Sequence, residues 1–309
     1  MSFPAPVPTV TDDDLAALEI EIQTAIASRS FGTLKVIGYG ETGVAVAHPA
    51  EEPVAVVKRL GSCVTREEID EWFDFLRAYE DSLARFVAIA PTEKRIVEGG
   101  PDGRLVPFLI QPLFSRSQLV EKILEETDPV VDHPMLVAVR DAALDALVDG
   151  RQVIDSQLSN FAWDGERLAL FDCGTPFVFH ADGEPDYRLG VFKSAFPAVL
   201  RPVAVKAAEK VMRDFRTPNG NLAHSALSAV RLGQERWLDA IIETFNAGME
   251  QRGVGEPLDR KHVLDQLDGI QRDMKLIKVV GRVNRAYVEK IRRKTYDFFI
   301  TDSFTKKLL

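Results

Sequence analysis

One short apolar hairpin, residues 153–174, constrains this chain more than any other stretch. Asp155 stands at its start, Asn160 follows five residues later, and the run Phe171-Asp172-Cys173-Gly174 ends it. A carboxylate can orient a hydroxyl group, and an amide with a second carboxylate can hold Mg²⁺; phosphoryl transfer needs these groups together. The pattern also has a plain structural explanation, because Asp and Asn are common in turns for local backbone reasons. What precedes the hairpin therefore decides between the two interpretations.

Composition narrows the class of protein. The 309 residues are 46% hydrophobic and 28% charged, which is typical of a globular chain with a sizeable core. The net charge of −9 argues against general nucleic-acid binding. Cys63 and Cys173 are too few and too far apart for a disulfide framework or a zinc site. With no signal-peptide pattern and no apolar run of about 20 residues, we expect a cytoplasmic protein without a membrane span.

The N-terminal third reads as an arm, a helix and then a small antiparallel sheet. Residues 1–32 are expected to form a flexible arm and a helix that Thr11 caps. The run Gly38-Tyr39-Gly40-Glu41-Thr42-Gly43 lies between two β-branched stretches, so it is followed by a strand. A dinucleotide-binding fold would need a helix there. The glycines either let backbone N–H groups approach phosphates or simply form a tight hairpin turn.

Lys58 ends the next apolar strand, residues 54–57. A buried ammonium needs an anionic partner, although a lysine at a strand end can also extend to water. The helix that Thr65 begins offers glutamates, and its apolar face is expected to pack on the sheet. Glu68 borders that face at about 70° from its centre and is the first choice, with Glu71 second. Both can equally be solvated or capping charges.

The rest of the chain divides at about residue 115. Further strands at 86–89, 95–97 and 105–110 complete the sheet, and mostly helix follows. The expected fold is therefore α+β, with a small antiparallel sheet part (33–114) that carries one main helix, and a larger helical part (115–309) that contains the hairpin. The patterns predict helices over residues 132–150, 188–200, 202–216, 221–247, 259–279 and 281–299.

Taken in order, the glycine run, Val54-Ala55-Val56-Val57-Lys58, the capped helix, Asp155-x-x-x-x-Asn160 and Asp172-Cys173-Gly174 resemble the protein-kinase-like superfamily. The chain looks more like its small-molecule branch, the aminoglycoside and choline kinase type. The resemblance covers about residues 33–180 and implies a bilobal fold whose first lobe ends at an interlobe hinge.

The resemblance also implies ATP and Mg²⁺ as cofactors and a role for each motif. Asp155 would accept the proton of the substrate hydroxyl, while Asn160 and Asp172 would bind Mg²⁺ that bridges the phosphates. Lys58 would hold the α- and β-phosphates, itself held by a helix glutamate. Gly38, Gly40 and Gly43 would cover the phosphates, and at the hinge adenine would bond to the C=O of Gln111 and the N–H of Leu113.

Three departures from the family pattern surround Asp155. Val153 stands where the family usually has His, Ile154 where protein kinases often have Arg, and Gln157 where a Lys or His is usual. No Ala-Pro-Glu segment follows Gly174. These departures favour transfer of the ATP γ-phosphate to a hydroxyl or amine of a small molecule. They leave open a pseudokinase that binds nucleotide or a protein partner without transfer, and a protein kinase.

The C-terminal region carries a different charge. Residues 272–309 hold 11 Lys or Arg and 4 Asp or Glu. Such a basic segment can bind an acidic substrate, an anionic surface or the acidic body of the same protein. The alternative is an ordinary solvated helix face beside apolar residues.

Overall fold

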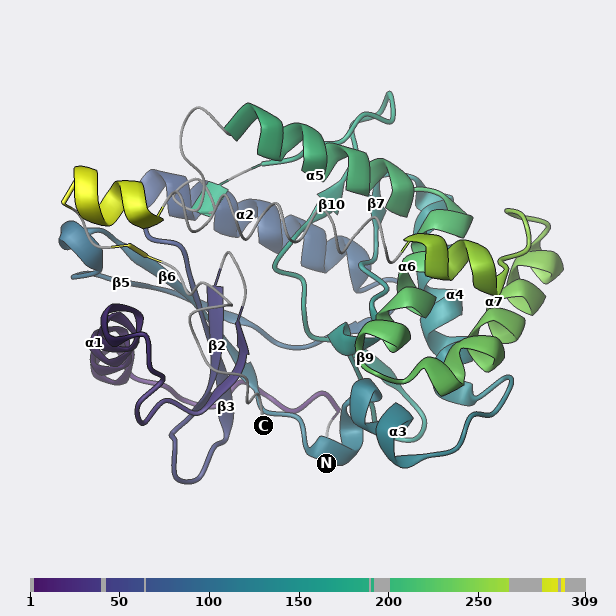
Figure 1. Ribbon diagram of the computed structural model, residues 1–309, viewed down its shortest axis with the longest axis horizontal. Coiled ribbons are helices and arrows are strands. Elements are labelled where there is room, and N and C mark those ends of the chain that lie inside the picture. Colours follow the sequence, from purple (N-terminus) through teal and green to yellow (C-terminus); the bar gives the residue numbers. More distant parts are fainter. Residues whose placement is uncertain are drawn as a thin grey trace.

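The computed structural model describes residues 3–39, 43–63, 65–188, 190–191, 201–266, 285–293 and 296–297. It confirms the expected α+β fold with a sheet lobe and a larger helical lobe (Figure 1). Five antiparallel strands form the sheet in the order β1-β2-β3-β6-β5. Their bounds are Val36–Tyr39, Gly43–His48, Ala55–Leu60, Val106–Pro112 and Glu93–Val97.

The first helix belongs to the sheet lobe. Helix α1 (Asp12–Ser28) starts at Thr11, whose hydroxyl accepts from the Asp14 N–H and whose own N–H donates to the Asp14 carboxylate. Apolar side chains of α1, such as Leu15 and Ile22, share a core with the sheet. The predicted helix is therefore present, and it covers one face of the sheet.

Helix α2 (Arg66–Leu83) has the predicted cap at Thr65 and the predicted apolar face, but that face packs differently from expectation. It joins the large core of the helical lobe, and the Tyr79 hydroxyl donates to the C=O of Val153 at 2.8 Å. Helix α2 therefore contacts the predicted catalytic hairpin as well as the sheet lobe.

The helical lobe surrounds short strands that carry the hairpin. Its helices are α3 (Val120–Glu126), α4 (Pro134–Asp149), α5 (Arg201–Phe215), α6 (Pro218–Arg231) and α7 (Leu238–Arg252). Strand β7 (Gln152–Val153) pairs with β10 (Phe177–Val178), and β9 (Leu168–Leu170) lies between β4 (Ala88–Ile89) and β8 (Phe161–Trp163). None of the helices in the described ranges is long and apolar enough to cross a membrane.

The predicted helix over 221–247 is wrong, since two helices occupy this stretch. Gly233 has φ of +76° and ends α6 after Arg231, and a 3₁₀ turn at Glu235–Trp237 leads into α7. Conversely, Pro218 begins α6 instead of a loop, because Thr217 caps the helix and proline suits its first turn. The predicted helices over 188–200 and 259–279 lie largely outside the described residues, while in the described part of 281–299 residues Tyr287–Ile291 form a short π-helix.

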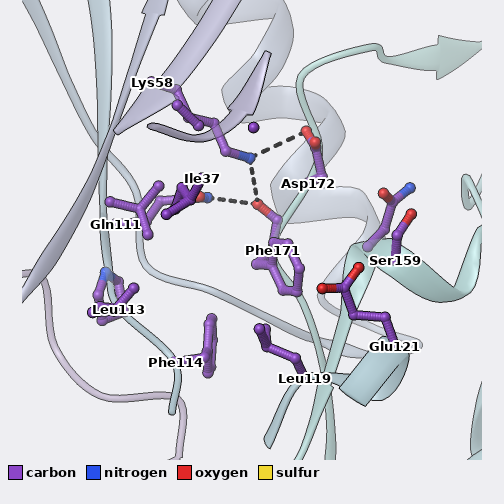
Figure 2. Close-up of a pocket in the computed structure, with 15 residues that line it drawn as sticks. Ile37, Lys58, Gln111, Leu113, Phe114, Leu119, Glu121, Ser159, Phe171 and Asp172 are labelled. Atoms are coloured by element: carbon purple, nitrogen blue, oxygen red, sulfur yellow. Dashed lines mark hydrogen bonds and ion pairs between the residues drawn. The ribbon is translucent and has the colours of Figure 1, made fainter. Parts of the chain in front are cut away.

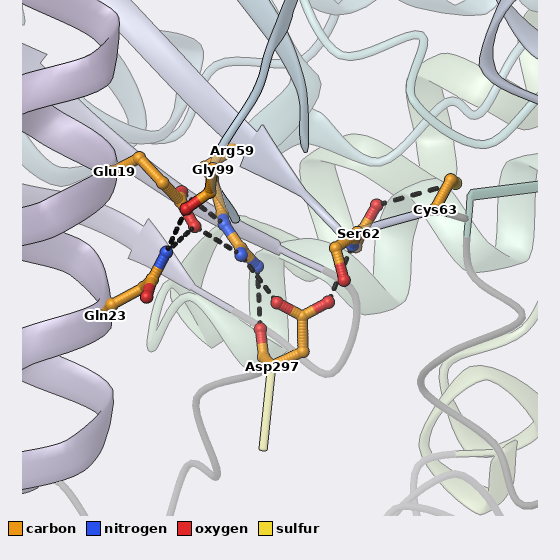
Figure 3. A network of polar contacts seen from close by, with 8 residues as sticks. Glu19, Gln23, Arg59, Ser62, Cys63, Gly99 and Asp297 are labelled. Atoms are coloured by element: carbon orange, nitrogen blue, oxygen red, sulfur yellow. Dashed lines mark hydrogen bonds and ion pairs between the residues drawn. The ribbon is translucent and has the colours of Figure 1, made fainter. Parts of the chain in front are cut away.

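A fully buried ion network joins the C-terminal segment to the sheet lobe (Figure 3). Arg59 on β3 donates to the Glu19 carboxylate of α1 through Nε and Nη2, at 3.0 and 2.9 Å. Its Nη2 also lies 2.5 Å from Oδ1 of Asp297, and the Ser62 N–H donates to Oδ2 of Asp297 at 2.6 Å. The described end of the chain thus packs on the sheet lobe, although the sequence assigned it to the helical lobe.

Candidate functional site

A pocket of about 310 Å³ lies between the sheet and the helical lobe. Adjacent residues on a strand point to opposite faces, so β3 directs Lys58 into this pocket and Arg59 away from it. Residues that line the pocket come from the sheet, from the connection after β6, from α3 and from the hairpin. They include Ile37, Gly38, Lys58, Gln111, Leu113, Phe114, Leu119, Glu121, Ser159, Asn160, Phe171 and Asp172.

The pocket has a polar end and an apolar end (Figure 2). Lys58 and Asp172 mark the polar end, while Leu113, Phe114 and Leu119 lie at the other. Phe114 packs against Phe171 with ring centroids 5.6 Å apart, and Phe3 of the N-terminal arm meets Phe114 at 5.8 Å. The arm therefore supports the aromatic wall of the pocket from outside.

Lys58 contacts the segment directly after β9, which carries Asp172. Its Nζ lies 3.3 Å from Oδ1 of Asp172 and donates to the C=O of Phe171 at 3.2 Å. The side-chain amide of Gln111 donates to the same carbonyl at 2.8 Å. Three predicted site residues that are far apart in the sequence therefore meet around the backbone of Phe171.

The predicted pairing of Lys58 with Glu68 is not found in the described part of the chain, where Asp172 is the ion-pair partner of Lys58. The prediction assumed that the apolar face of α2 packs on the sheet beside Lys58. That face joins the core of the helical lobe, and Tyr79 on it bonds to the hairpin. Glu68 is half-buried there and its N–H donates to Thr65, whereas Glu71 is exposed.

A different glutamate of α2, Glu80, forms a buried ion pair. Glu80 pairs with Lys94 of β5 at 2.5 Å, and both side chains are largely buried. Burial raises the pKa of Glu80, and the hydrogen bond from Lys94 opposes that rise. Burial raises the pKa of the Cys173 thiol well above its usual range, and the negative charges of Glu80 and Asp172 add to the rise. Cys173 therefore stays protonated and serves as a small core residue.

Asn160 and Asp172 face the same pocket, as a shared metal site requires. The Nδ2 of Asn160 donates to the C=O of Asp155 at 3.2 Å, which leaves its Oδ1 for a cation. Lys58 and the Gly174 N–H contact only Oδ1 of Asp172. Within the described residues, no three His, Cys, Asp or Glu side chains gather at one point. The two oxygen donors fit Mg²⁺, which usually binds one or two protein ligands together with phosphates and water.

Asp155 lies beside this pair but does not line the pocket. Its Oδ1 and Oδ2 accept from Nε2 of Gln157 at 3.1 and 3.0 Å, and Oδ1 also accepts from the Gln157 N–H at 3.3 Å. Burial raises the pKa of Asp155 to about 6, the charge of Asp172 adds to the rise, and the bonds from Gln157 oppose it. A half-buried carboxylate with this pKa can accept a proton near neutral pH.

Helix α6 holds the loop that carries Asp155. The buried Nδ2 of Asn221 donates to the C=O of Ile154 at 3.0 Å, and the Ser156 hydroxyl donates to the C=O of Asn221 at 2.9 Å. The Leu158 N–H donates to the Ser228 hydroxyl at 2.8 Å. Because these bonds are buried, they fix the loop more firmly than exposed ones would.

The predicted hinge differs in one important detail. Gln111 and Leu113 both line the pocket, but the Leu113 N–H donates to the C=O of Val54 at 3.0 Å. The donor expected for adenine is thus already engaged in extending the β3–β6 pairing. This geometry contradicts a free Leu113 N–H, while the role of the Gln111 carbonyl stays a prediction.

The predicted glycines fall into three cases. Gly38 lines the pocket, and Gly40 lies outside the described residues. Gly43 begins β2, where an added Cβ would stand 2.7 Å from the backbone oxygen of Arg59. A close approach of two strands therefore requires Gly43, whatever the loop binds.

Sequence reasoning missed several contacts at the site. The sequence marked Gln157 only as a departure from a pattern. Nothing in the sequence connects Lys94 or Arg231 with the hairpin, although Arg231 donates to Gln157 at 3.0 Å. These side chains meet only because the chain folds back on itself.

Comparison with known proteins adds little to this geometry. No protein-family model matches the chain, and no curated protein matches it. Among solved structures, it is similar to the kinase domain of Mycobacterium tuberculosis PknI, both as a point mutant and in a second crystal structure. Identity is 17% in both, with 64% of this chain and 71% or 70% of that chain covered, at TM-scores of 0.29 and 0.30. The description of the fold therefore rests on the arrangement of strands and helices given above.

Proposed function

We propose that this protein is an ATP- and Mg²⁺-dependent phosphotransferase that acts on a hydroxyl or amine of a small molecule. The observation that carries the proposal is the meeting of Lys58, Asn160 and Asp172 at one end of an interlobe pocket. These residues supply one cation and two oxygen donors, which suit phosphates and a hard metal ion.

The shape of the pocket supports the same assignment. Its apolar end, with Phe114 beside Phe171, suits a flat base, and its polar end suits charged phosphates. A nucleotide bound in this direction would place its terminal phosphate beside Asn160 and Asp172. Asp155, whose backbone C=O accepts a hydrogen bond from the Asn160 side chain, would then face the acceptor.

Each residue has a defined task in the proposed reaction. Lys58 would exchange its bond to Asp172 for phosphate oxygens, which frees the Asp172 carboxylate for the metal. Asn160 would hold the same metal through Oδ1. Asp155 would orient the acceptor hydroxyl and take its proton, which its raised pKa favours. When bound, Mg²⁺ would neutralise charge that develops on the phosphates.

Two measurements test the proposal in sequence. Mg-ATP should raise the melting temperature, because it binds the folded protein. A metabolite screen should then reveal turnover of ATP, and Asp172→Ala should remove it. Asp155→Ala should lower turnover by about 10²–10⁴-fold, as loss of a general base does. Unchanged turnover in Asp155→Ala would exclude Asp155 from the mechanism, and no thermal shift would exclude the nucleotide site.

A nucleotide-binding module without transfer activity is the second candidate. It is favoured because Asp155, the proposed general base, does not line the pocket, whereas Lys58, Asn160 and Asp172 do. A thermal shift with Mg-ATP, without turnover in the screen, would select this candidate.

A further inference from the structure

Arg231 is an exposed residue in the last turn of α6, yet it is bound to the loop that carries Asp155. Its Nη1 donates to Oε1 of Gln157 at 3.0 Å. The Nε2 of the same Gln157 contacts both carboxylate oxygens of Asp155, at 3.1 and 3.0 Å. One neutral amide thus bridges a guanidinium and a carboxylate that lie 76 residues apart in the sequence (231 − 155).

Charge at both ends decides how the amide of Gln157 is oriented. In the observed orientation, the oxygen faces the cation and the NH₂ group faces the anion. In the flipped orientation the amide oxygen would face the Asp155 carboxylate, and the NH₂ group would face the Arg231 guanidinium. Both contacts would be repulsive, so the flipped orientation is disfavoured. Arg231 therefore locks the amide group that holds Asp155 in place.

An ordinary explanation exists for a cation at this position, because the C-terminal end of a helix attracts positive charge. Arg213, in the last turn of α5, illustrates that case through an exposed pair with Glu184. The helix end does not, however, require a hydrogen bond to Gln157. That bond is the reason to assign Arg231 a role at the site.

We propose that Arg231 is a positioning residue for phosphoryl transfer. Through Gln157 it fixes the Asp155 carboxylate toward the acceptor and supplies a positive charge that the loop itself lacks at position 157. This inference rests on the proposed function, since it names a residue that acts on the same reaction.

The effect should appear in kinetics and hardly in stability. Arg231 is exposed, and an exposed arginine contact adds little to folding, so Arg231→Met should fold normally. Arg231→Met and Gln157→Ala should each lower the turnover of Mg-ATP about 10-fold with an unchanged KM for ATP, the size typical of residues that orient a ligand. The double variant should be no slower than either single one, because both break one chain of contacts. Arg213→Met is the matched control and should keep full turnover.

A second substitution separates positioning from a general structural effect. Gln157→Lys puts an ammonium directly beside Asp155. In that background, Arg231→Met should not lower the turnover of Mg-ATP any further. Independent losses that multiply in the double variant, or a full effect of Arg231→Met in the Gln157→Lys background, would overturn the proposal.

An NMR measurement keeps this test distinct from that of the proposed function. The side-chain amide signal of Gln157, assigned by its loss in Gln157→Ala, should shift in Arg231→Met and stay in place in Arg213→Met. An unmoved signal with active protein would overturn the role of Arg231 alone. A native protein without any turnover would overturn the proposed function and, with it, the catalytic purpose of this contact.

Discussion

Asp155 and Asp172 lie in one site but in different electrostatic surroundings. Asp172 is paired with the Lys58 ammonium, whereas the Asp155 carboxylate receives its hydrogen bonds from Gln157, a neutral residue. Burial and the charge of Asp172 therefore raise the pKa of Asp155 to about 6. A carboxylate with a raised pKa can accept a proton near neutral pH, which is the task proposed for Asp155.

The raised pKa predicts a pH-dependent cost of keeping Asp155 ionised. Its folded-state pKa of about 6 lies above the ordinary 3.8, so the folded protein binds this proton more tightly than the unfolded chain. Stability from this group is thus fully present below pH 4 and lost as pH rises through 6. Asp155→Asn should raise the free energy of unfolding by on the order of 1–2 kcal/mol at pH 7.5, because the neutral amide carries no such cost.

Urea denaturation at two pH values checks this prediction. The gain from Asp155→Asn should be much smaller at pH 4.5, where the folded protein already holds the proton. Asp74→Asn is the control, since Asp74 forms an exposed pair with Arg77 and should change stability little at either pH. Equal gains of Asp155→Asn at both pH values would contradict the assignment.

At the scale of single elements, two helices that flank the hairpin in the sequence, α2 and α6, hold the loop that carries Asp155. Tyr79 of α2 bonds to Val153, while Asn221 and Ser228 of α6 bond to residues 154 and 158. Val153 and Ile154, the two apolar residues before Asp155, are fully buried in this packing. Their apolar character is therefore explained by the core around the loop.

The β2–β3 pairing yields a prediction that separates Gly38 on β1 from Gly43 on β2. Gly43→Ala should cost about 1–3 kcal/mol of stability, because its Cβ would press on the Arg59 carbonyl at 2.7 Å. At Gly38 the nearest atom to an added Cβ is 3.8 Å away, an ordinary contact, so Gly38→Ala should be tolerated. Urea denaturation of both variants measures the difference, and equal losses would show that the strand contact does not matter.

At the scale of the whole molecule, both ends of the described chain pack on the sheet lobe. The N-terminal arm reaches the pocket wall through Phe3, and Asp297 joins Arg59 and Glu19 on the far side of β3. Arg285 adds a bond to the C=O of Ile26 on α1 at 3.0 Å. The sheet lobe is therefore completed by the first and the last segments among the described residues.

The buried network makes Asp297 a stability determinant for the sheet lobe. Asp297→Asn should lower the free energy of unfolding by about 2–4 kcal/mol, since an amide donor would face the Ser62 N–H and Arg59 would lose a counter-charge. Asp239→Asn is the matched control, because Asp239 pairs with Arg260 at the surface and should cost at most about 1 kcal/mol.

Hydrogen exchange provides the second readout of this prediction. Peptides from α1 and β3 should exchange faster in Asp297→Asn than in the native protein, because Glu19 and Arg59 lie on those elements. Exchange that rises only near the C-terminus, with unchanged stability, would show that the segment is not an integral part of the lobe.

The sequence by itself determined most of the elements and several of the residues that line the pocket. The caps at Thr11 and Thr65, the strand around Lys58 and the hairpin of Asn160 and Asp172 follow from local periodicity and turn chemistry. Only the tertiary structure decided which side chains pair: Lys58 with Asp172, Glu80 with Lys94, Arg231 with Gln157 and Asp297 with Arg59. Local patterns cannot predict these pairs. The pairs form where packing brings together segments that lie up to 238 residues apart in the sequence.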